Sequence, residues 1–273
     1  MTRGRATIGP LRGAIRNVSG TGKEVFLHLA DVVPYGLGEW KRLVALGLLT
    51  APYVTARKLA NAVTCELERL HRATRPRSIP YVAIVDVNSS CNLQCPYCPT
   101  GNRRQSGRSS TLIDVSAVKS LIDEMGDYLI TANLYNWGEP LLHPDIAQMV
   151  NLFHERGIAT FVSSNMNIKN TKVLEELCDA GLDWLVVSLS GATQDTYQLY
   201  HRGGRLERVL ENTGHLLAYR NGMRSKRPCV EWKYLVFGHN VHEVARARGM
   251  ARALGVDVFR PLSGSGPEPA RKG

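Results

Sequence analysis

The 273-residue sequence lacks a hydrophobic run long enough to cross a lipid bilayer. A membrane-spanning helix needs about 20 consecutive apolar residues. The most apolar stretch, Leu43–Ala56, is shorter and is interrupted by Pro52. No apolar segment follows the basic N-terminus as it would in a secretory signal. These absences predict a cytoplasmic protein, with attachment to a membrane surface as a minor alternative because Lys41–Arg42 and Arg57–Lys58 flank the apolar stretch.

Cysteine is scarce, with six residues in the whole chain, and three of these lie within eight positions, Cys91 to Cys98. A secreted disulfide scaffold would spread more cysteines over a shorter chain. Thiols that stay reduced are instead available to a metal. Of the scattered cysteines, Cys178 lies on an apolar helix face and Cys229 precedes a strand, so both are predicted to be core residues.

Acidic residues are few in the first 80 positions, which hold 13 Lys and Arg against 5 Asp and Glu. This part of the chain therefore carries +8 of the formal net charge of +10. A basic arm suits an anionic partner such as nucleic acid, a membrane surface or a nucleotide-like substrate. A solvated extension is the simpler interpretation, and the charge alone does not decide between the two.

The organisation of the chain predicts three parts. Residues 1–75 form a basic, partly helical extension with a helix pair around Lys41 to Arg72. Residues 76–262 form a regular core, and residues 263–273, rich in Gly, Ser and Pro, form a flexible tail. Within the core, apolar runs predict strands at residues 81–87, 130–136, 159–162, 184–188, 230–237 and 256–259. Between them, helices are predicted at residues 114–125, 144–156, 171–180, 205–219 and 241–254.

Strict alternation of strands and helices predicts an α/β fold with parallel strands and right-handed crossovers. A doubly wound open sheet and an incomplete barrel both fit, because the core is shorter than the roughly 250 residues of an eight-unit barrel. In either architecture, functional residues gather at the carboxyl ends of the strands.

The strongest chemical signal is the segment Cys91-Asn-Leu-Gln-Cys95-Pro-Tyr-Cys98, which directly follows the first predicted strand. Three thiolates on one short loop can hold three irons of a [4Fe–4S] cluster. Electron-carrying clusters normally have four cysteine ligands, and no fourth cysteine lies nearby, so one iron would stay open for a small molecule. A structural zinc site would need a fourth cysteine or a histidine at finger-like spacing, which the loop does not supply.

This C-x3-C-x2-C motif resembles the signature of the radical S-adenosylmethionine (radical SAM) superfamily, in which an aromatic residue, here Tyr97, precedes the third cysteine. The resemblance implies a (β/α)6 partial TIM-like barrel, here with an N-terminal helical extension. It also implies one [4Fe–4S] cluster on Cys91, Cys95 and Cys98, with S-adenosyl-L-methionine (SAM) bound to the open iron. In that family, reductive cleavage of SAM gives a 5′-deoxyadenosyl radical that abstracts hydrogen from the substrate.

The resemblance also implies SAM contacts at the ends of later strands. Asn136-Trp-Gly-Glu-Pro140 resembles the family motif Gly-Gly-Glu-Pro, which holds the SAM amino group, with Trp137 in place of the first glycine. Small polar residues end the third and fourth strands, and an arginine in Tyr197-Gln-Leu-Tyr-His-Arg202 resembles one that pairs with the SAM carboxylate. The predicted cofactor-binding residues are Tyr97, Gly138, Glu139, Pro140, Ser164, Asn165, Ser188 and Arg202.

Four further polar residues lie near the ends of predicted strands or helices and are candidates for a functional or a structural role. His143, at a helix entrance, is predicted to be structural. His239, Asn240 and Arg260 follow or end the last two strands and are equally suited to substrate contact or to structure.

The motif phrases resemble the SPASM-type branch of the family, but no cysteine follows Cys229, so the C-terminal cysteine-rich extension of that branch is absent. The predicted function is a radical SAM enzyme that tailors a metabolite, sugar or peptide and draws electrons from a donor such as flavodoxin or ferredoxin. The alternatives are an RNA-modifying enzyme and a truncated, non-catalytic partner protein.

The barrel mouth is predicted to need cover from outside the core. About a dozen residues follow Phe259 and cannot close it. The helical segment Lys41–Arg77 is therefore expected to pack against the barrel and supply part of its wall, unless a partner chain closes it.

Overall fold

The structure is a computed structural model, and it describes residues 45–102 and 111–264. Six parallel strands form one sheet in the order β1-β2-β3-β4-β5-β6, and each strand pairs with its neighbours in the chain. β1 and β6 are the two edges, so the barrel is open. The strands are β1 (Val82–Ile84), β2 (Thr131–Asn133), β3 (Ala159–Ser164), β4 (Trp184–Leu189), β5 (Cys229–Val236) and β6 (Val258–Ser263).

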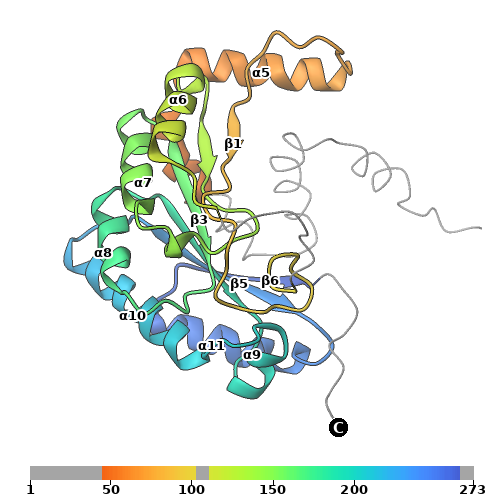
Figure 1. The fold of residues 1–273 in the computed structure, drawn as a ribbon, viewed down its shortest axis with the longest axis vertical. Coiled ribbons are helices and arrows are strands. Elements are labelled where there is room, and N and C mark those ends of the chain that lie inside the picture. The colour runs from red at the N-terminus through yellow and green to blue at the C-terminus, as the bar shows by residue number, and fades with distance from the viewer. Residues whose placement is uncertain (1–44, 103–110, 265–273) are drawn as a thin grey trace, which may run out of the picture.

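The crossover helices cover the outer side of this sheet (Figure 1). They are α6 (Val115–Met125), α7 (Ile146–Glu155), α8 (Lys172–Asp179), α9 (Gln194–Tyr200), α10 (Leu206–Gly222) and α11 (Val244–Leu254). Short 3₁₀ turns, η2 (Pro140–Leu142) and η3 (Val241–Glu243), precede α7 and α11. This arrangement is the partial barrel that the sequence predicts.

Alternating side chains of the strands enter two separate clusters. Leu185 and Val187 of β4 join the large core beneath the helices, whereas Trp184 and Val186 face the opposite, concave side. The concave cluster also holds Phe161 of β3, and its members lie toward the amino ends of the strands. Polar residues can therefore occupy the concave face toward the carboxyl ends.

The predicted elements are all present, with shifts at their ends. β1 and β2 are shorter than predicted, and the helix expected from Pro144 begins at Ile146 after the turn η2. Helix α9 was not predicted from the sequence. A reciprocal pair of hydrogen bonds between Thr193 and Thr196 caps its N-terminus. This helix matters for the site because it positions the segment that ends at Arg202.

Residues 45–53 plug the amino-terminal end of the concave face. Residues 45–50 are helical, and Leu46 and Leu49 pack with Tyr53 of η1 (Ala51–Tyr53) against Trp184 and its neighbours. The Tyr53 hydroxyl donates to Asp183, just before β4, at 2.8 Å. The plug is thus anchored by apolar packing and by a buried hydrogen bond.

Helix α5 (Ala56–Leu70) lies across the same end of the sheet, at the top of Figure 1. Its polar side chains bind the loops that lead into three strands. Arg57 pairs with Asp127 before β2 at 2.9 Å, Lys58 donates to the Gly157 carbonyl before β3 at 2.5 Å, and Glu66 accepts from Tyr81 before β1 at 2.7 Å. α5 therefore covers the amino ends of the strands.

This placement corrects one expectation. The described part of Lys41–Arg77 does pack on the barrel, but it seals the end opposite the carboxyl ends, so it does not close the mouth. Loops that precede parallel strands all lie at the amino end, and these loops supply the partners of α5. Residues 41–44 lie outside the described part. Among the described residues, no helix has the length and apolar character that a membrane crossing requires.

Candidate functional site

The three-cysteine loop lies between β1 and α6, with Cys91, Cys95 and Cys98 all partly buried. Backbone hydrogen bonds between nearby residues hold its shape. The Cys98 backbone amide donates to the Cys95 carbonyl at 3.3 Å, and the Asn102 backbone amide donates to the Cys98 carbonyl at 2.9 Å. The Gln94 amide donates to the Arg202 carbonyl at 2.9 Å. The loop is therefore fastened directly to the segment that follows α9.

Two glycines let backbone segments approach around this loop. A Cβ on Gly101 would lie 2.5 Å from the Cys95 amide nitrogen, and a Cβ on Gly138 would lie 1.5 Å from the Asn88 carbonyl oxygen. Neither position can hold a side chain without moving backbone. Gly138 thus serves first as a packing residue, which brings the Gly-Glu-Pro turn against the start of the cysteine loop.

The thiols lie close enough to influence one another. Burial raises the pKa of Cys91 to about 11 and that of Cys95 to about 12, and neighbouring thiols add to both shifts. Without a cation, the protein environment therefore favours neutral thiols. Thiolates are the species that bind iron. Loading a cluster would therefore release protons, and the positive charge of the irons would offset the repulsion between the thiolates.

The donor set fits a cluster. Within residues 45–102 and 111–264, no three His, Cys, Asp or Glu side chains converge on a single metal-ion position. An iron–sulfur cube does not require such convergence, because each thiolate binds a different iron. Three sulfur donors on a loop tightened by Gly101 are suited to holding three corners of a [4Fe–4S] cluster.

Glu139 is buried and satisfied by the protein. Its carboxylate accepts hydrogen bonds from the backbone amides of Asn165 at 2.8 Å and Leu141 at 3.1 Å, and the Ser164 side chain also donates to it. Its own amide donates to the Ser90 carbonyl at 2.8 Å. Glu139 therefore ties the end of β3 to the turn after β2 and to the cysteine loop, with Pro140 opening the turn η2 beside it.

An asparagine network, which the sequence analysis missed, completes this platform. Asn165 donates to Asn92 at 2.9 Å and to the Cys91 sulfur at 3.6 Å, and Asn92 donates to the Asn167 carbonyl at 2.8 Å. Asn167 in turn donates to the Tyr197 hydroxyl at 2.8 Å. The cysteine loop, the end of β3 and α9 are thus joined by amide side chains. An asparagine adjacent to a ligand cysteine was the available sequence signal.

The predicted serines take different places. Ser164 is buried between Glu139 and the Met166 amide, which donates to it at 2.9 Å. Ser188 is half-buried and lies on the concave face, on the same side of β4 as Trp184 and Val186. Ser188 is thus the serine placed to meet a ligand, while Ser164 shapes the turn.

Arg202 lies beside the cysteine loop with its side chain exposed. Among the residues that the structure describes, no hydrogen bond or ion pair engages its guanidinium. The nearby Arg205, by contrast, pairs with Glu207 at 2.8 Å. Arg202 is therefore available to an external anion.

Tyr97 joins an aromatic group at the same end of the sheet. Its ring centroid lies 6.2 Å from that of Tyr200 and 6.4 Å from that of Phe237 after β5. Tyr200 and Phe237 are 5.0 Å apart. The aromatic residue of the motif thus packs the cysteine loop against α9 and β5.

Four other predictions are settled by contacts. His143 is structural as predicted, since Nδ1 accepts from the Asp145 amide at 3.0 Å and Nε2 donates to the Ile113 carbonyl at 2.9 Å. Cys178 and Cys229 are core residues as predicted. Asn240 is fully buried and its side-chain amide nitrogen donates to the Ser190 carbonyl at 2.6 Å, so it is structural.

Arg260 is the third of the six residues of β6, and His239 follows the carboxyl end of β5. Arg260 is buried and lies 3.8 Å from Glu231, which also accepts from the Trp184 indole at 3.0 Å. His239 is buried with its ring stacked on Phe237 at 5.4 Å. Both belong to the interior of the concave side.

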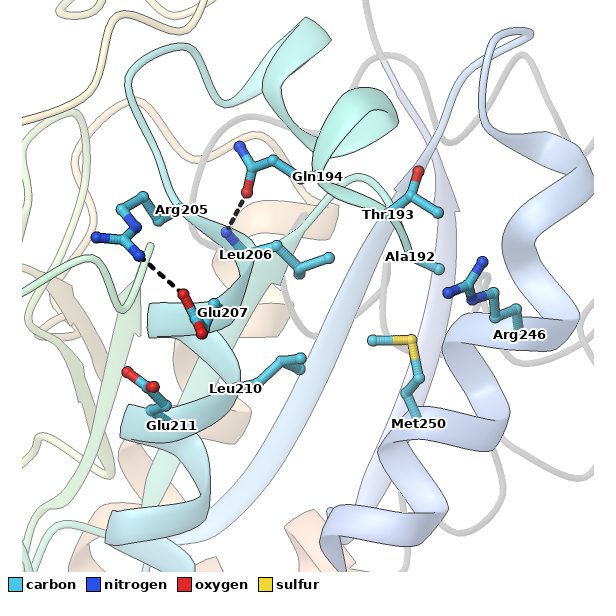
Figure 2. A pocket seen from close by; sticks show the side chains of 10 residues that line it. All are labelled: Ala192, Thr193, Gln194, Arg205, Leu206, Glu207, Leu210, Glu211, Arg246 and Met250. Carbon is cyan, nitrogen blue, oxygen red and sulfur yellow. Dashed lines mark hydrogen bonds and ion pairs between the residues drawn. The ribbon is translucent and has the colours of Figure 1, made fainter.

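A separate groove of about 800 Å³ lies on the outer side, between the start of α10 and α11 (Figure 2). Leu206 and Leu210 line it on one helix, and Arg246 and Met250 on the other. None of the predicted site residues lines this groove. The candidate site is therefore the carboxyl end of the sheet.

Comparison with known sequences places these features in a family. A family model for the radical SAM superfamily matches residues 85–225. GTP 3′,8-cyclase of Chlorobaculum tepidum is 31% identical over 143 residues, which cover 52% of this chain and 42% of that protein. PqqA peptide cyclase of Bradyrhizobium diazoefficiens is 25% identical over 166 residues, covering 61% and 39%. The chain spans about two fifths of the length of these relatives.

Solved structures agree on the fold. SuiB of Streptococcus suis superposes with a TM-score of 0.59 at 14% identity, covering 76% of this chain and 44% of that one. Methylornithine synthase (PylB) superposes with a TM-score of 0.52 at 14% identity, covering 82% and 65%. The match of the family model to more than half of the residues, which include the cysteine loop and the strands β2, β3 and β4, shows that the chain belongs to the radical SAM superfamily.

Proposed function

We propose that this protein is a radical SAM enzyme that cleaves SAM reductively and uses the product to abstract hydrogen from its substrate. The observation that carries the proposal is the loop of three partly buried cysteines, fastened through Gln94 to the exposed Arg202. When bound, a reduced [4Fe–4S] cluster supplies the electron that splits SAM into methionine and the 5′-deoxyadenosyl radical.

The protein's own residues have three tasks in this proposal. Cys91, Cys95 and Cys98 hold the cluster as thiolates. Arg202 binds the SAM carboxylate through a charge-assisted, forked contact. Ser188, on the open concave face, contacts the sugar or carboxylate of SAM.

Other residues that were predicted to contact SAM instead hold the surrounding backbone in position. Glu139 has its carboxylate occupied by Asn165, Leu141 and Ser164, so it holds the turn that Gly138 and Pro140 form. SAM would meet the exposed edge of that turn, near Tyr97. Asn165 shapes the platform through its contacts to Asn92 and Cys91.

The substrate is proposed to be a small molecule or a peptide. The matched relatives include a GTP cyclase and a peptide cyclase, and one solved neighbour, SuiB, is bound to the precursor peptide SuiA. An electron donor such as flavodoxin or ferredoxin would reduce the cluster. Because thiols stay reduced there, we place the reaction in the cytoplasm.

The test is production of 5′-deoxyadenosine by the anaerobically reconstituted chain with SAM and dithionite. Wild type should carry about four irons per chain and release 5′-deoxyadenosine and methionine. The triple variant Cys91→Ala/Cys95→Ala/Cys98→Ala should contain no cluster and release neither product. Cys178→Ala is the matched control, since this thiol is a buried core residue. A triple variant that keeps a full cluster, or wild type that holds zinc as its stoichiometric metal, would sink the proposal.

A further inference from the structure

Helix α5 is amphipathic in the opposite sense to an ordinary surface helix. Its polar side chains face the barrel, as described above, and its large apolar side chains face outward. Leu59, Val63, Leu67 and Leu70 are 54%, 51%, 50% and 63% exposed. Their spacing of four, four and three residues places them along one side of the helix.

Most of the residues beside them are small and uncharged. Ala56, Ala60 and Thr64 are also exposed and lie on the same face. The charged residues of the helix are turned elsewhere, as in Arg57 pairing with Asp127 and Arg69 with Glu66. We call the face formed by Leu59, Val63, Leu67 and Leu70 the apolar stripe. It runs most of the helix, and the one charged residue in line with it, Glu66, is only 26% exposed at its side chain and is paired with Arg69 at 2.7 Å.

Basic residues follow the stripe directly. The segment after Leu70 is exposed and includes Arg72, Arg75 and Arg77. A stripe of aliphatic side chains bordered by arginines has the composition of a helix that lies in the interface of an anionic bilayer.

The size of the stripe argues against a stable protein partner. A 15-residue helix is about 22 Å long and about 10 Å wide, so the stripe has a footprint of roughly 200 Å². A standard protein interface covers about 800 Å² per partner. Pairing of two copies through this helix alone would therefore be weak. A lipid surface has no such minimum, because apolar burial and the attraction of arginines to anionic headgroups add along the helix.

We propose that α5 is a peripheral membrane-docking helix that inserts its apolar stripe into the surface of an anionic bilayer, with Arg72, Arg75 and Arg77 on the headgroups. α5 covers the amino ends of the strands. The docked enzyme would therefore hold its cysteine loop at the end away from the lipid, open to the aqueous side. This docking is independent of the reaction proposed above.

The test uses the full, cluster-loaded chain and two kinds of vesicle, one of phosphatidylcholine alone and one of equal parts phosphatidylcholine and phosphatidylglycerol. Wild type should sediment with the anionic vesicles and bind the neutral ones far more weakly. Added salt should reduce binding to the anionic vesicles, since the attraction is screened.

Variants separate the two contributions. Val63→Asp/Leu67→Asp should lower vesicle partitioning tenfold or more, whereas Met223→Asp, at an exposed apolar site of similar exposure outside α5, should leave it unchanged. Arg72→Gln/Arg75→Gln/Arg77→Gln should lower binding to anionic vesicles by about fivefold per arginine at low salt. All three variants should unfold like wild type, because the changed side chains are exposed.

Two outcomes would overturn the docking proposal. Wild type could remain in the supernatant with both vesicle types. Light scattering could instead show a dimer that Val63→Asp/Leu67→Asp converts to a monomer, without vesicle binding, which would make the stripe a contact between copies. Formation of 5′-deoxyadenosine without vesicles should not differ between wild type and the stripe variant, so failure of docking and failure of the radical SAM assignment are read separately.

Discussion

The two ends of the sheet differ in whether the protein itself supplies partners to Asp183 at one end and to the thiols and Arg202 at the other. At the amino end, Asp183 is 1% exposed at its side chain and binds Tyr53, Arg227 and the Thr160 amide at 2.8, 3.1 and 2.9 Å. At the carboxyl end, three thiols are partly buried with few donors, and Arg202 is exposed. Asp183 at the amino end is saturated by the protein, whereas the thiols and Arg202 at the carboxyl end remain available to cofactors.

This contrast matches the division found in TIM barrels, where residues at the amino-terminal face serve stability and residues at the carboxyl-terminal face carry out the chemistry. Here the difference arises from what packs on each end. The segment 45–70 covers the amino end, and loops that carry Cys91–Cys98 and Arg202 form the other. Substitutions at one end should therefore change stability, and those at the other should change binding.

The largest change in stability is expected for Asp183→Ala. It removes the acceptor of three donors and leaves Arg227 and the Tyr53 hydroxyl without their buried partner. Removing one member of a buried ion pair costs about 3–5 kcal/mol. Anaerobic urea titration at equal cluster content measures the loss. An unchanged midpoint would show that the amino end does not depend on this carboxylate.

A pH dependence is expected from Glu139, which lies at the carboxyl end and supports the cysteine loop. Burial raises its pKa to about 7 from an ordinary value of 4.5, although hydrogen bonds from Asn165, Leu141 and Ser164 oppose the shift. The folded state thus keeps a proton that the unfolded chain releases at lower pH. Its contribution to stability is complete below about pH 4.5 and is lost as pH rises through about 7.

Glu139→Gln keeps an uncharged side chain at every pH. The unfolding free energy of wild type should therefore fall relative to this variant between about pH 5 and 8, by at most about 3 kcal/mol. Urea titrations of both proteins across that range measure the difference. A constant difference would mean that Glu139 is ionised throughout.

Arg202→Ala should change binding while sparing the fold and the cluster. Loss of a hydrogen-bonded charge pair costs about 1.5–3 kcal/mol, which is a tenfold or greater loss of SAM affinity. Arg202→Lys should recover little of it, because an ammonium lacks the planar fork. Arg205→Ala is the control, since this exposed arginine pairs with Glu207. Equal SAM affinity in equilibrium dialysis for wild type and both Arg202 variants would remove Arg202 from the site.

The smallest effect is expected for Asp127→Ala, at the same end as Asp183. Asp127 pairs with Arg57 at 2.9 Å and Arg156 at 2.7 Å, but its side chain is 44% exposed. Exposed ion pairs contribute about 0–1 kcal/mol. A loss as large as that of Asp183→Ala would show that exposure does not distinguish these carboxylates.

The elements that depend on local pattern were predictable. The six strands and five of the crossover helices follow from runs of apolar residues, and the cysteine spacing alone identifies the loop that faces the cofactors. α9 was missed because it is short and polar and depends on the Thr193–Thr196 cap rather than on apolar periodicity. Strand ends were least predictable, since neighbouring strands decide where pairing stops.

Contacts between distant segments were not predictable. The link from Asn92 to Asn167 spans 75 positions, and that from Tyr53 to Asp183 spans 130. An amide or a hydroxyl has no spacing pattern that marks its partner. For the same reason, the sequence does not show which end of the barrel Lys41–Arg77 covers, and the described part of this segment lies at the amino end instead of the mouth.

By itself, the sequence determined the family motif, the alternating fold and the residue types that can bind iron and SAM, because these depend on local spacing and chemistry. The tertiary structure decided which of those residues remain available. Glu139 and Asn165 are used to build the platform, while Arg202 and Ser188 stay accessible. It also decided that α5 turns its charged side inward and its apolar stripe outward, because the loops before β1, β2 and β3 present the hydrogen-bonding partners that this helix satisfies.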